Sequence, residues 1–564
     1  MLNSFVELNG REWAKALLDK GTFRELLGPL DRLESPHLEP QGIVPQSDDG
    51  IIVAIGQINT KNVLIISMEG AFQGGGIGEV SGAKISASLE LVLEENKQGK
   101  TIYPIMIFDT GGVRLQEANY GLLSISEIGN QIVALRNYVP VVGIIPGRVG
   151  AFGGMSITAG LFTTLIATNK ARLGLNGPEV IEQEAGVMEF DSSDQTLIWN
   201  TIGSNQRLKT GLVDAVVEDD TEVIIHTIDS VLTAKANPAK TEQIDFYQTL
   251  LNDIDLSLEW TPEKYTAYYK QLQPVQQAVP MAGEGHSVSS NSRGYKWFSY
   301  LTGIVHPTSS VPSVLAADIE KNGQLCRYIS IVPDPNNKFP RVRNGEVGLL
   351  EGWTVAQVVR DAIQQDENKE IKRPIIAIID VPSQAYGYKE ELIGINLALA
   401  ASADAYATAR QKGHPVIGLI VGNAISGGFL AHGLQSNRLI ALDDEKITIQ
   451  AMSKASAARI TKRTIAELEE ATKKVPAMAY DVRGYSTLGA LYKLVSNINP
   501  DQPTEQDIEE IEQTLVEAIN STKGTVTDLS FRLTTKEALA GGRAATIKVR
   551  ELLKEQWKFD HMIL

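Results

Sequence analysis

The sequence has very little cysteine, and its one thiol excludes several kinds of structure. Cys326 is the only cysteine among 564 residues, so an intrachain disulfide, a four-cysteine zinc site and a CxxC redox pair are excluded. The seven histidines are scattered, without an HExxH pattern or a close pair, so we expect no protein-ligated metal. A chain of this length is expected to bury a core large enough to fold without such crosslinks.

Basic residues are also in deficit. The chain has 52 lysines and arginines against 68 acidic residues, a formal net charge of −16, and no basic run with interleaved aromatic residues. Because a phosphate backbone would be repelled by this charge, we expect no nucleic-acid partner. Hydrophobic residues make up 43% and charged residues 21%, which is typical of a globular chain.

The sequence lacks the long apolar runs that span membranes. Two stretches, 149–169 and 415–437, contain no Asp, Glu, Lys or Arg, but glycine pairs and polar side chains interrupt both. We interpret them as buried strand–turn–helix segments and expect no membrane span. The first twenty residues mix acids and bases and lack the apolar core of a signal peptide, so we expect a cytoplasmic protein.

What the sequence does contain is an internal duplication. One apolar run in the first half ends in Asp109, and a similar run in the second half ends in Asp380. A second apolar run follows in each half and begins at Pro140 or at Pro415. Each of these prolines is followed, after 13 and 12 residues respectively, by a glycine pair: Gly153-Gly154 and Gly427-Gly428. The chain is therefore predicted to consist of two related halves.

The repeated pattern indicates an α/β fold. Short runs rich in Val and Ile and bounded by turn residues are typical of strands buried on both faces. Apolar residues from Leu122 to Leu135 recur at three- and four-residue steps, which is a helical spacing. Strands that alternate with helices predict a parallel sheet with right-handed crossovers. We expect two α/β domains, 1–270 and 295–564, joined by a Gln-, Pro-, Ser- and Gly-rich linker at 271–294.

The glycine pairs indicate a site that stabilises negative charge on an oxygen atom. Glycine permits close approach of the backbone to a ligand, and the first amides of a helix have no intrahelical acceptor. A carbonyl oxygen that gains negative charge would be stabilised there, as in an oxyanion hole. Further donors would come from the turn after the earlier strand: Gly111-Gly112-Val113 and Ser383-Gln384-Ala385. The alternative, that these glycines serve only tight packing, is weakened by their recurrence in both halves.

Four segments of the first half resemble the β subunit of bacterial acetyl-CoA carboxyltransferase, a member of the crotonase-like group: FQGGGIGEVSGAK (72–84), TGGVRLQEANYGLL (110–123), VGAFGGMSIT (149–158) and GLNGPEVIEQ (174–183). The second half resembles the α subunit through PIIAIIDVPSQAYG and GNAISGGFLAHG. Nearly the whole chain is more similar to the β and γ subunits of biotin-independent malonate decarboxylase, joined here in one chain. The openings of the two halves, 4–50 and SRGYKWFSYLTG (292–303), carry this similarity. The resemblance implies two tandem crotonase-like domains of the ββα-superhelix type.

The resemblance also implies a function. It predicts decarboxylation of a malonyl thioester carried on an acyl carrier protein, which releases CO2 and leaves the acetyl thioester. The carrier would supply a phosphoribosyl-dephospho-CoA arm, with no cofactor tightly bound in this chain. Expected partners are the malonyl-loaded carrier protein and an acyl carrier protein transferase subunit, and a homo-oligomer is compatible with this prediction. The alternative is a biotin-dependent acyl-CoA carboxyltransferase or decarboxylase subunit; no AMKM biotinylation sequence is present, although another polypeptide could carry biotin.

These predictions assign roles to two sets of residues. Loss of CO2 leaves an enolate whose oxygen needs hydrogen-bond donors, and amides of the first half would hold it. Amides of the second half would face them across the junction and hold the departing carboxylate, and water or the Ser426 hydroxyl would supply a proton. The expected catalytic residues are Gly112, Val113, Gly153, Gly154, Ser383, Gln384, Ala385, Ser426, Gly427 and Gly428. The residues expected to bind the phosphate-bearing arm are Gln73, Gly74, Gly75, Gly76, Lys84 and Arg114.

Overall fold

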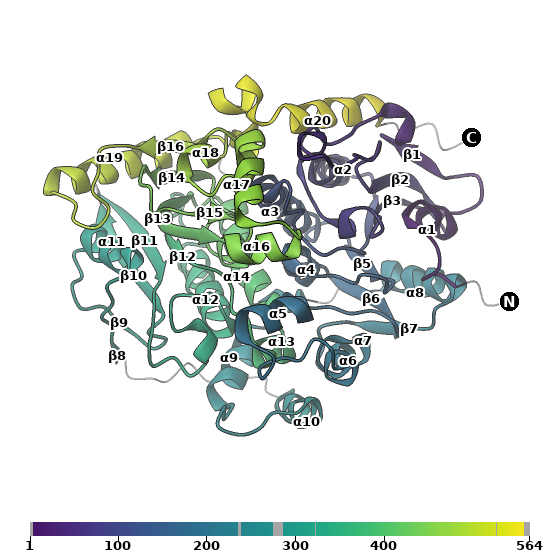
Figure 1. The fold of residues 1–564 in the computed structure, drawn as a ribbon, viewed down its shortest axis with the longest axis horizontal. Helices are drawn as coiled ribbons and strands as arrows, with labels where there is room; N and C mark the ends of the chain where they lie inside the picture. The colour runs from purple at the N-terminus through teal and green to yellow at the C-terminus, as the bar shows by residue number, and fades with distance from the viewer. Residues whose placement is uncertain (1–3, 235–237, 274–285, 322, 526, 558–564) are drawn as a thin grey trace.

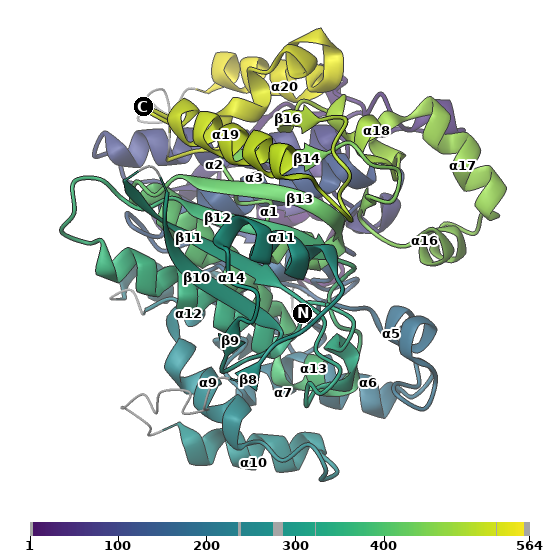
Figure 2. The same ribbon diagram turned by 90° about the vertical axis from the view of Figure 1, so that its left-hand side faces the viewer.

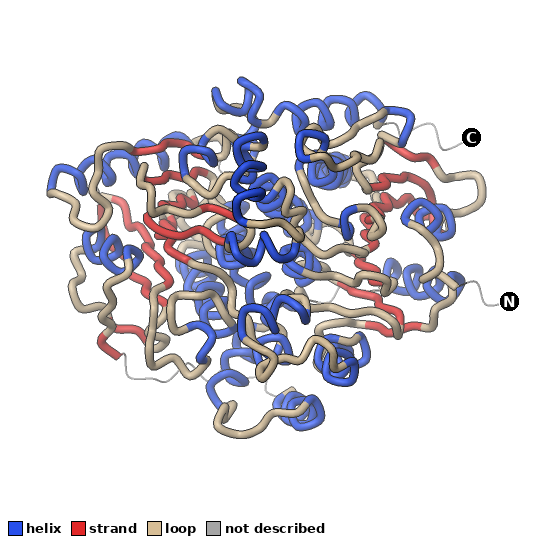
Figure 3. Tube along the Cα trace, in the orientation of Figure 1, coloured by secondary structure: helices blue, strands red, loops and turns tan. Residues whose placement is uncertain are grey.

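Two seven-stranded sheets lie at opposite ends of the long axis of the molecule, with helices between them (Figure 1, Figure 3). The predicted α/β class is confirmed. The computed structural model describes residues 4–234, 238–273, 286–321, 323–525 and 527–557. The central part of the predicted linker therefore lies outside the described residues. Within the described ranges, no helix is both long and apolar enough to cross a membrane.

The first sheet is mixed, whereas the sequence predicted a parallel sheet. Its strand order is β1-β2-β3-β4-β5-β6-β7; β1 to β3 pair antiparallel, and β3 to β7 pair parallel. Asn59 and Thr60 join β2 to β3 with φ of +46° and +66°, which favours a tight hairpin over a crossover helix. The strands are β1 (Arg24–Leu26), β2 (Ile51–Ile58), β3 (Lys61–Met68), β4 (Tyr103–Ile107), β5 (Val142–Ile145), β6 (Thr164–Thr168) and β7 (Ala215–Val217).

The second sheet has the same plan, as the internal duplication predicts. An antiparallel hairpin of β10 and β11 leads into the parallel strands β12, β13, β14 and β16, and β15 pairs with β13. Two further short strands, β8 (His286–Ser287) and β9 (Thr308–Ser309), pair with each other. The strands of the large sheet are β10 (Val314–Lys321), β11 (Gln324–Ile331), β12 (Ile375–Val381), β13 (Val416–Ile425), β14 (Arg438–Leu442), β15 (Ile449–Gln450) and β16 (Leu491–Val495).

Helices cover the sheets and fill the space between them. Those of the first half are α1 (Gly10–Leu17), α2 (Glu79–Lys97), α3 (Ala118–Leu135), α4 (Gly153–Gly160), α5 (Pro178–Ala185), α6 (Gln195–Ile202), α7 (Ser204–Lys209), α8 (Thr221–Thr233), α9 (Ile244–Asp253) and α10 (Pro262–Leu272). Those of the second half are α11 (Arg293–Thr302), α12 (Leu349–Gln365), α13 (Tyr388–Ile393), α14 (Ile395–Gln411), α15 (Ser426–Ala431), α16 (Lys454–Ile460), α17 (Ile465–Lys474), α18 (Val482–Ser486), α19 (Glu505–Ser521) and α20 (Ala544–Gln556). The helix predicted from the spacing of apolar residues corresponds to α3, which is buried along most of its length.

The two halves are interlocked in space. Helices α3 and α4 of the first half contact α14 and α15 of the second. Helix α9, near the end of the first half, packs on α12, where Tyr247 stacks on Trp353 at a centroid distance of 4.4 Å. Helix α20, at the end of the second half, packs on α2 of the first (Figure 1). Each half therefore covers the other with a segment from its own C-terminal region.

A buried ion pair crosses the junction between the halves. Asp404 on α14 is fully buried and accepts hydrogen bonds from the guanidinium of Arg136, directly after α3, at 2.8 and 2.9 Å. Arg360 donates to the same carboxylate at 3.3 Å. Burial acts to raise the pKa of Asp404, but the two guanidinium groups and further hydrogen bonds hold that pKa below its ordinary value. The carboxylate is therefore charged in the folded protein and ties the two halves together.

Replacing Asp404 by alanine should destabilise the fold by about 3–5 kcal/mol, because the buried guanidinium of Arg136 would lose its partner. Denaturant titration of the full chain would measure the free energy of unfolding. Glu517→Ala is the matched control, since it removes a carboxylate from an exposed pair with Lys493, and it should have a much smaller effect. Equal losses in the two variants would contradict the role assigned to Asp404.

Candidate active site

Two turns of the first half lie against each other beyond the ends of β4 and β5. Asp109 follows β4, and its Oδ1 accepts the N–H of Val149 at 2.6 Å, which holds the second turn beside the first. Gly112 has φ of +103°, and a Cβ atom at this position would lie 2.8 Å from Gly153 Cα. The same Cβ would lie 3.2 Å from the amide nitrogen of Gly154. Glycine at position 112 therefore permits the turn and keeps that amide uncovered.

Two amides at these turns, those of Val113 and Gly154, have no hydrogen-bond acceptor among the described residues. Gly154 is the second residue of α4, so its N–H has no intrahelical acceptor and lies at the positive end of the helix dipole. The other two predicted donors are committed within the chain: Gly112 N–H to Thr110 Oγ1 at 3.0 Å, and Gly153 N–H to the Leu175 carbonyl at 2.9 Å. The open donors of the first half are thus Val113 and Gly154.

The loop after β3 packs against the same turn. Gln73, Gly74 and Gly75 adopt successive positive φ values of +48°, +63° and +66°. The carbonyl of Gly74 accepts the N–H of Gly111 at 2.8 Å. A Cβ at Gly75 would lie 2.0 Å from the carbonyl oxygen of Asp109, so only glycine fits there. The loop is therefore held next to the open amides.

The second half repeats the first of these turns at a matched backbone position. A parallel bridge joins Ile77, just before α2, to Val113, and the same kind of bridge joins Val347, just before α12, to Gln384. Gln384 in the second half therefore corresponds to Val113 in the first.

The second turn also recurs, but one residue away from the alignment predicted from the glycine pairs. Gly153 and Ser426 are the first residues of α4 and α15, and their φ values are +56° and +58°. Gly154 therefore corresponds to Gly427, and not to Gly428 as the sequence pattern suggested. The pattern misled because a serine adopts the left-handed conformation that a glycine adopts in the first half.

In the second half, a side chain closes the corresponding amide. The N–H of Gly427 donates to Oε1 of Gln384 at 2.9 Å, and Nε2 of Gln384 donates to Oδ1 of Asn176 at 2.9 Å. The N–H of Ala385 donates to the carbonyl of Val347 at 3.0 Å. The expectation that the Ala385 and Gly427 amides are open donors is therefore wrong.

A cavity of about 510 Å³ lies where the turns of the two halves meet. Its lining also includes part of α5 and the segment around α16. Nine of the predicted site residues line it: Gln73, Gly74, Gly76, Val113, Arg114, Gly153, Gly154, Gln384 and Ser426. Seven do not: Gly75, Lys84, Gly112, Ser383, Ala385, Gly427 and Gly428. The cavity therefore brings together the open amides of the first half and the closed turn of the second.

Helices from both halves meet beside this cavity. In Figure 2, α5, α16 and α17 lie on the same side of the molecule. The Nε2 of Gln183 on α5 donates to the hydroxyl of Ser456 on α16 at 2.7 Å, and that hydroxyl is also hydrogen-bonded to Glu184. Contacts between the halves therefore define one edge of the cavity.

Lys84 does not reach the cavity. Its side chain is fully buried, and Nζ donates to the backbone carbonyls of Leu27, Asp48 and Ile51. Burial lowers the pKa of Lys84 to about 8. The prediction that Lys84 binds a phosphate-bearing arm is wrong, because the lysine ties α2 to the backbone around the start of β2.

Arg114 lines the cavity, but its guanidinium is already paired. Its Nη1 lies 2.6 Å from Asp49 Oδ1 and 2.7 Å from Glu117 Oε2, and the Phe72 ring lies 5.1 Å from Cζ. Burial acts to lower the pKa of Arg114, but the two carboxylates raise it above its ordinary value. This arginine therefore braces the cavity wall.

Sequence reasoning missed Arg172, a cation that lines the cavity. Its guanidinium packs over the rings of Phe152 and Trp199, with Cζ 5.8 and 5.9 Å from the centroids. It pairs with no carboxylate in the part of the chain that the structure describes. The one signal for Arg172 in the sequence was its position just before the GLNGPEV segment.

The contact through Glu391 was also missed. Glu391 on α13 is fully buried and accepts the backbone N–H groups of Leu175 at 3.1 Å and Asn176 at 2.7 Å. Burial raises the pKa of this carboxyl, although Arg207, 3.5 Å away, acts in the opposite direction. No motif marks Glu391, because its role depends on a segment about 215 positions away in the sequence.

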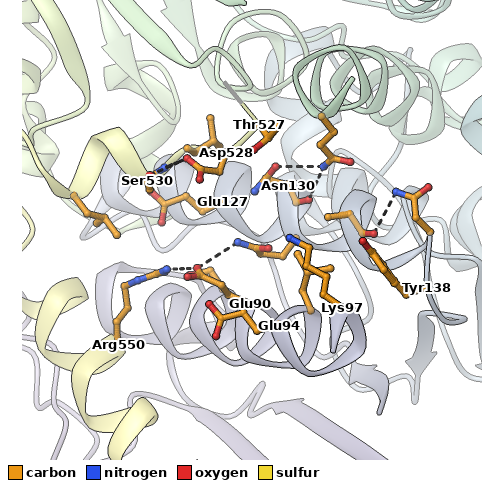
Figure 4. A pocket seen from close by; sticks show the side chains of 18 residues that line it. Glu90, Glu94, Lys97, Glu127, Asn130, Tyr138, Thr527, Asp528, Ser530 and Arg550 are labelled. Atoms are coloured by element: carbon orange, nitrogen blue, oxygen red, sulfur yellow. Dashed lines mark hydrogen bonds and ion pairs between the residues drawn. The ribbon is translucent and has the colours of Figure 1, made fainter. Parts of the chain in front are cut away.

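A second cavity, of about 400 Å³, lies between α2, α3 and the C-terminal segment (Figure 4). Arg550 pairs with Glu90 there, and Gln131 donates to the same carboxylate at 3.4 Å. None of the predicted turn residues lines it. The cavity at the junction of the halves is therefore the candidate active site.

Comparison with known proteins identifies relatives of both halves. The carboxyl transferase domain family matches residues 8–272, and the malonate decarboxylase gamma subunit family matches residues 342–557. The malonyl-S-ACP:biotin-protein carboxyltransferase MADC of Malonomonas rubra is 42% identical over 239 residues, which cover 41% of this chain and 75% of MADC. MADD of the same organism is 39% identical over 192 residues, covering 33% of this chain and 66% of MADD. A chain of a Pseudomonas malonate decarboxylase hetero-tetramer, solved with malonate, is 48% identical with a TM-score of 0.47, covering 48% of this chain and 98% of that chain.

The duplicated fold and the cavity between paired amide turns define an enzyme of the carboxyltransferase type. The chain belongs to the carboxyltransferase family, and its halves correspond to the β and γ subunits of malonate decarboxylase joined in one chain. It therefore carries two tandem α/β domains of the same plan.

Glu390, the neighbour of Glu391 on α13, is buried with no ion pair of its own among the described residues. Burial raises the pKa of Glu390 to about 7, and the nearby Glu189 acts in the same direction. Glu189 is paired with Arg341 at 2.9 Å, which links the two halves next to Glu390.

Glu390→Gln should flatten the pH dependence of stability. Because the folded pKa of about 7 lies above the ordinary 4.5, the stabilising contribution is complete below about pH 4.5 and is lost as pH rises through 7. A pKa shift of this size corresponds to about 3 kcal/mol in the free energy of unfolding. Denaturant titrations across this pH range would measure it. Glu510→Gln, at an exposed position of α19, should keep the wild-type profile, and an unflattened profile in Glu390→Gln would contradict the assignment.

Proposed function

We propose that this protein decarboxylates a malonyl thioester carried on an acyl carrier protein, giving CO2 and an acetyl thioester. The observation that carries the proposal is the pair of open amides, Val113 and Gly154, in the wall of the cavity. The descriptions of the relatives support the substrate, since MADC and MADD act on malonyl-S-ACP and the Pseudomonas relative is a malonate decarboxylase.

The open amides fit the charge that this reaction develops. When the bond to the carboxylate carbon breaks, its electron pair forms an enolate whose oxygen is the former thioester carbonyl. Two N–H donors hold that oxygen, and loss of one such donor costs about 3–4 kcal/mol in the barrier of other enzymes. Leu115, Leu175 and Met452 line the same cavity, and apolar surroundings favour neutral CO2 over the carboxylate.

The enolate carbon then takes a proton to form the acetyl group. The Ser426 hydroxyl is one source, because Ser426 lines the cavity. Water in the cavity is the other source.

The phosphate-bearing arm of the carrier, a phosphoribosyl-dephospho-CoA group, would lie along the loop that contains Gln73, Gly74 and Gly76. Arg172 takes the place of Lys84 as the cation for its phosphate, because Arg172 lines the cavity and pairs with no carboxylate among the described residues. The proposed partners are the acyl carrier protein, which the malonyl-S-ACP in the names of MADC and MADD supports, and an acyl carrier protein transferase subunit. A cytoplasmic location, where the lone thiol stays reduced, completes the proposal.

Carboxyl transfer to biotin is the second candidate function. MADC and MADD are described as biotin-protein carboxyltransferases, which favours it. The closed Gly427 amide favours decarboxylation. Reconstitution with a malonyl-loaded carrier protein, with and without avidin, separates the two: CO2 release that persists with avidin supports decarboxylation by this chain, and inhibition by avidin favours biotin.

Gly154→Pro should lower the rate of CO2 release about 10²–10³-fold, because it deletes one of the two open amide donors. A Cβ at this position would lie 2.8 Å from Leu430 Cδ1 and 2.9 Å from Ile125 Cδ1, so any substitution crowds these side chains. Gly154→Ala is the matched control, since it introduces the same Cβ and keeps the N–H. Equal activity in the two folded variants, checked by thermal unfolding, would show that this amide plays no part.

A further inference from the structure

The two halves differ at one matched position of their amide turns. Val113 and Gln384 occupy the same place in the bridges that precede the long helices α2 and α12. In the first half, the Val113 side chain packs towards Gly121, where a Cβ would lie 2.7 Å from Val113 Cγ1, and the Gly154 amide stays open. In the second half, the Gln384 side chain covers the corresponding amide.

Gln384 places a carbonyl oxygen where a ligand's carbonyl would otherwise bind. Its Oε1 accepts the N–H of Gly427 at 2.9 Å, on the second residue of α15. This amide corresponds to the open donor Gly154 of the first half. Gln384 is 6% exposed and lines the cavity, so its side chain separates the Gly427 amide from any molecule bound there.

The closing side chain is held from the opposite half. Its Nε2 donates to Oδ1 of Asn176 at 2.9 Å. Asn176 is itself fixed, because its N–H donates to Glu391 Oε1 at 2.7 Å and its Nδ2 donates to the Ala385 carbonyl at 2.9 Å. Withdrawal of Gln384 would leave both Asn176 Oδ1 and the Gly427 N–H without their partners in a buried site.

We propose that Gln384 determines the fate of the CO2: it closes the second-half amide site to a carbonyl-bearing acceptor, so that CO2 leaves as a free product. This inference rests on the proposed function. Transfer to a ureido acceptor such as biotin forms a C–N bond to CO2, while the ureido N–H proton passes to the enolate carbon and yields the acetyl thioester. Such an acceptor needs a donor for its carbonyl oxygen, and the Gly427 N–H is already occupied.

Gln384→Val tests the closure directly, because it installs the residue of the matched position in the first half. The Gly427 amide should then exchange hydrogen at least about tenfold faster than in the wild type, measured by mass spectrometry of the peptide that contains it. This readout does not require activity. An unchanged exchange rate would overturn the proposal.

The reciprocal variant, Val113→Gln, is the matched control. It places a carboxamide beside the open Gly154 amide and should lower CO2 release about 10²-fold or more, as loss of an oxyanion donor does. It should leave the exchange of the Gly427 amide as in the wild type. If Val113→Gln kept full CO2 release, a carboxamide at this position would not close an amide site.

The consequence for specificity is tested with free biotin as the probe. Malonyl-loaded carrier protein labelled in its free carboxyl group is incubated with biotin and with either the wild type or Gln384→Val. We expect labelled carboxybiotin from the variant alone, with a raised ratio of transfer to CO2 release. Transfer by the wild type, or faster amide exchange in the variant without any carboxybiotin, would overturn the specificity role. A wild type that releases no CO2 from the malonyl thioester would instead overturn the proposed function, and the specificity role with it.

Discussion

The active site depends on one constraint: the N–H of Gly154, at the start of α4, donates no hydrogen bond to any other described residue. Its position follows from the packing of two turns, in which Gly112 leaves space above the Gly154 nitrogen. Asp109 holds the second turn through the N–H of Val149. Gly112 therefore keeps the Gly154 amide uncovered, while Gly75 allows the close approach of the neighbouring loop. This arrangement suits the proposed chemistry, because the open donors would stabilise an oxygen that gains charge.

The duplication supplied two such turns, and they have diverged. Both halves keep the bridge before the long helix and the left-handed residue that begins the short helix, at Gly153 and Ser426. They differ in the side chain of the bridge residue, which is apolar in Val113 and hydrogen-bonded across the site in Gln384. The two turns therefore have matching backbones but different amide sites. The difference is the Gln384 carboxamide, which occupies the second-half amide.

Much of the fold could be predicted from the sequence. The two α/β halves, the helix at α3 and the strand that ends before Asp109 follow from periodicity, which depends on local burial. The hairpin of β2 and β3 was missed because its connecting pair, Asn59-Thr60, contains no glycine and carries a weak signal. The hairpin of β10 and β11 was missed although an Asn-Gly pair, a strong hairpin signal, stands between these strands in the sequence. Among the predicted donors, Val113 and Gly154 have open amides, whereas the Gly112, Gly153 and Gly427 amides are committed within the chain. Lys84, Arg172 and Glu391 were misassigned or missed because their partners are distant in sequence and emerge only from tertiary packing.

The exchange of terminal segments between the halves has a consequence for how the catalytic unit is assembled. Helix α9 of the first half packs on α12 of the second, and α20 of the second half packs on α2 of the first. Without the other half, each half would therefore expose a helix surface that is covered in the full chain. In a chain that joins the two, the local concentration of each half at the other's surface is set by the tether and not by expression level. The two halves are thus present in a one-to-one ratio because they are covalently joined. The cavity at their junction forms within one chain, so dilution does not separate its two sides.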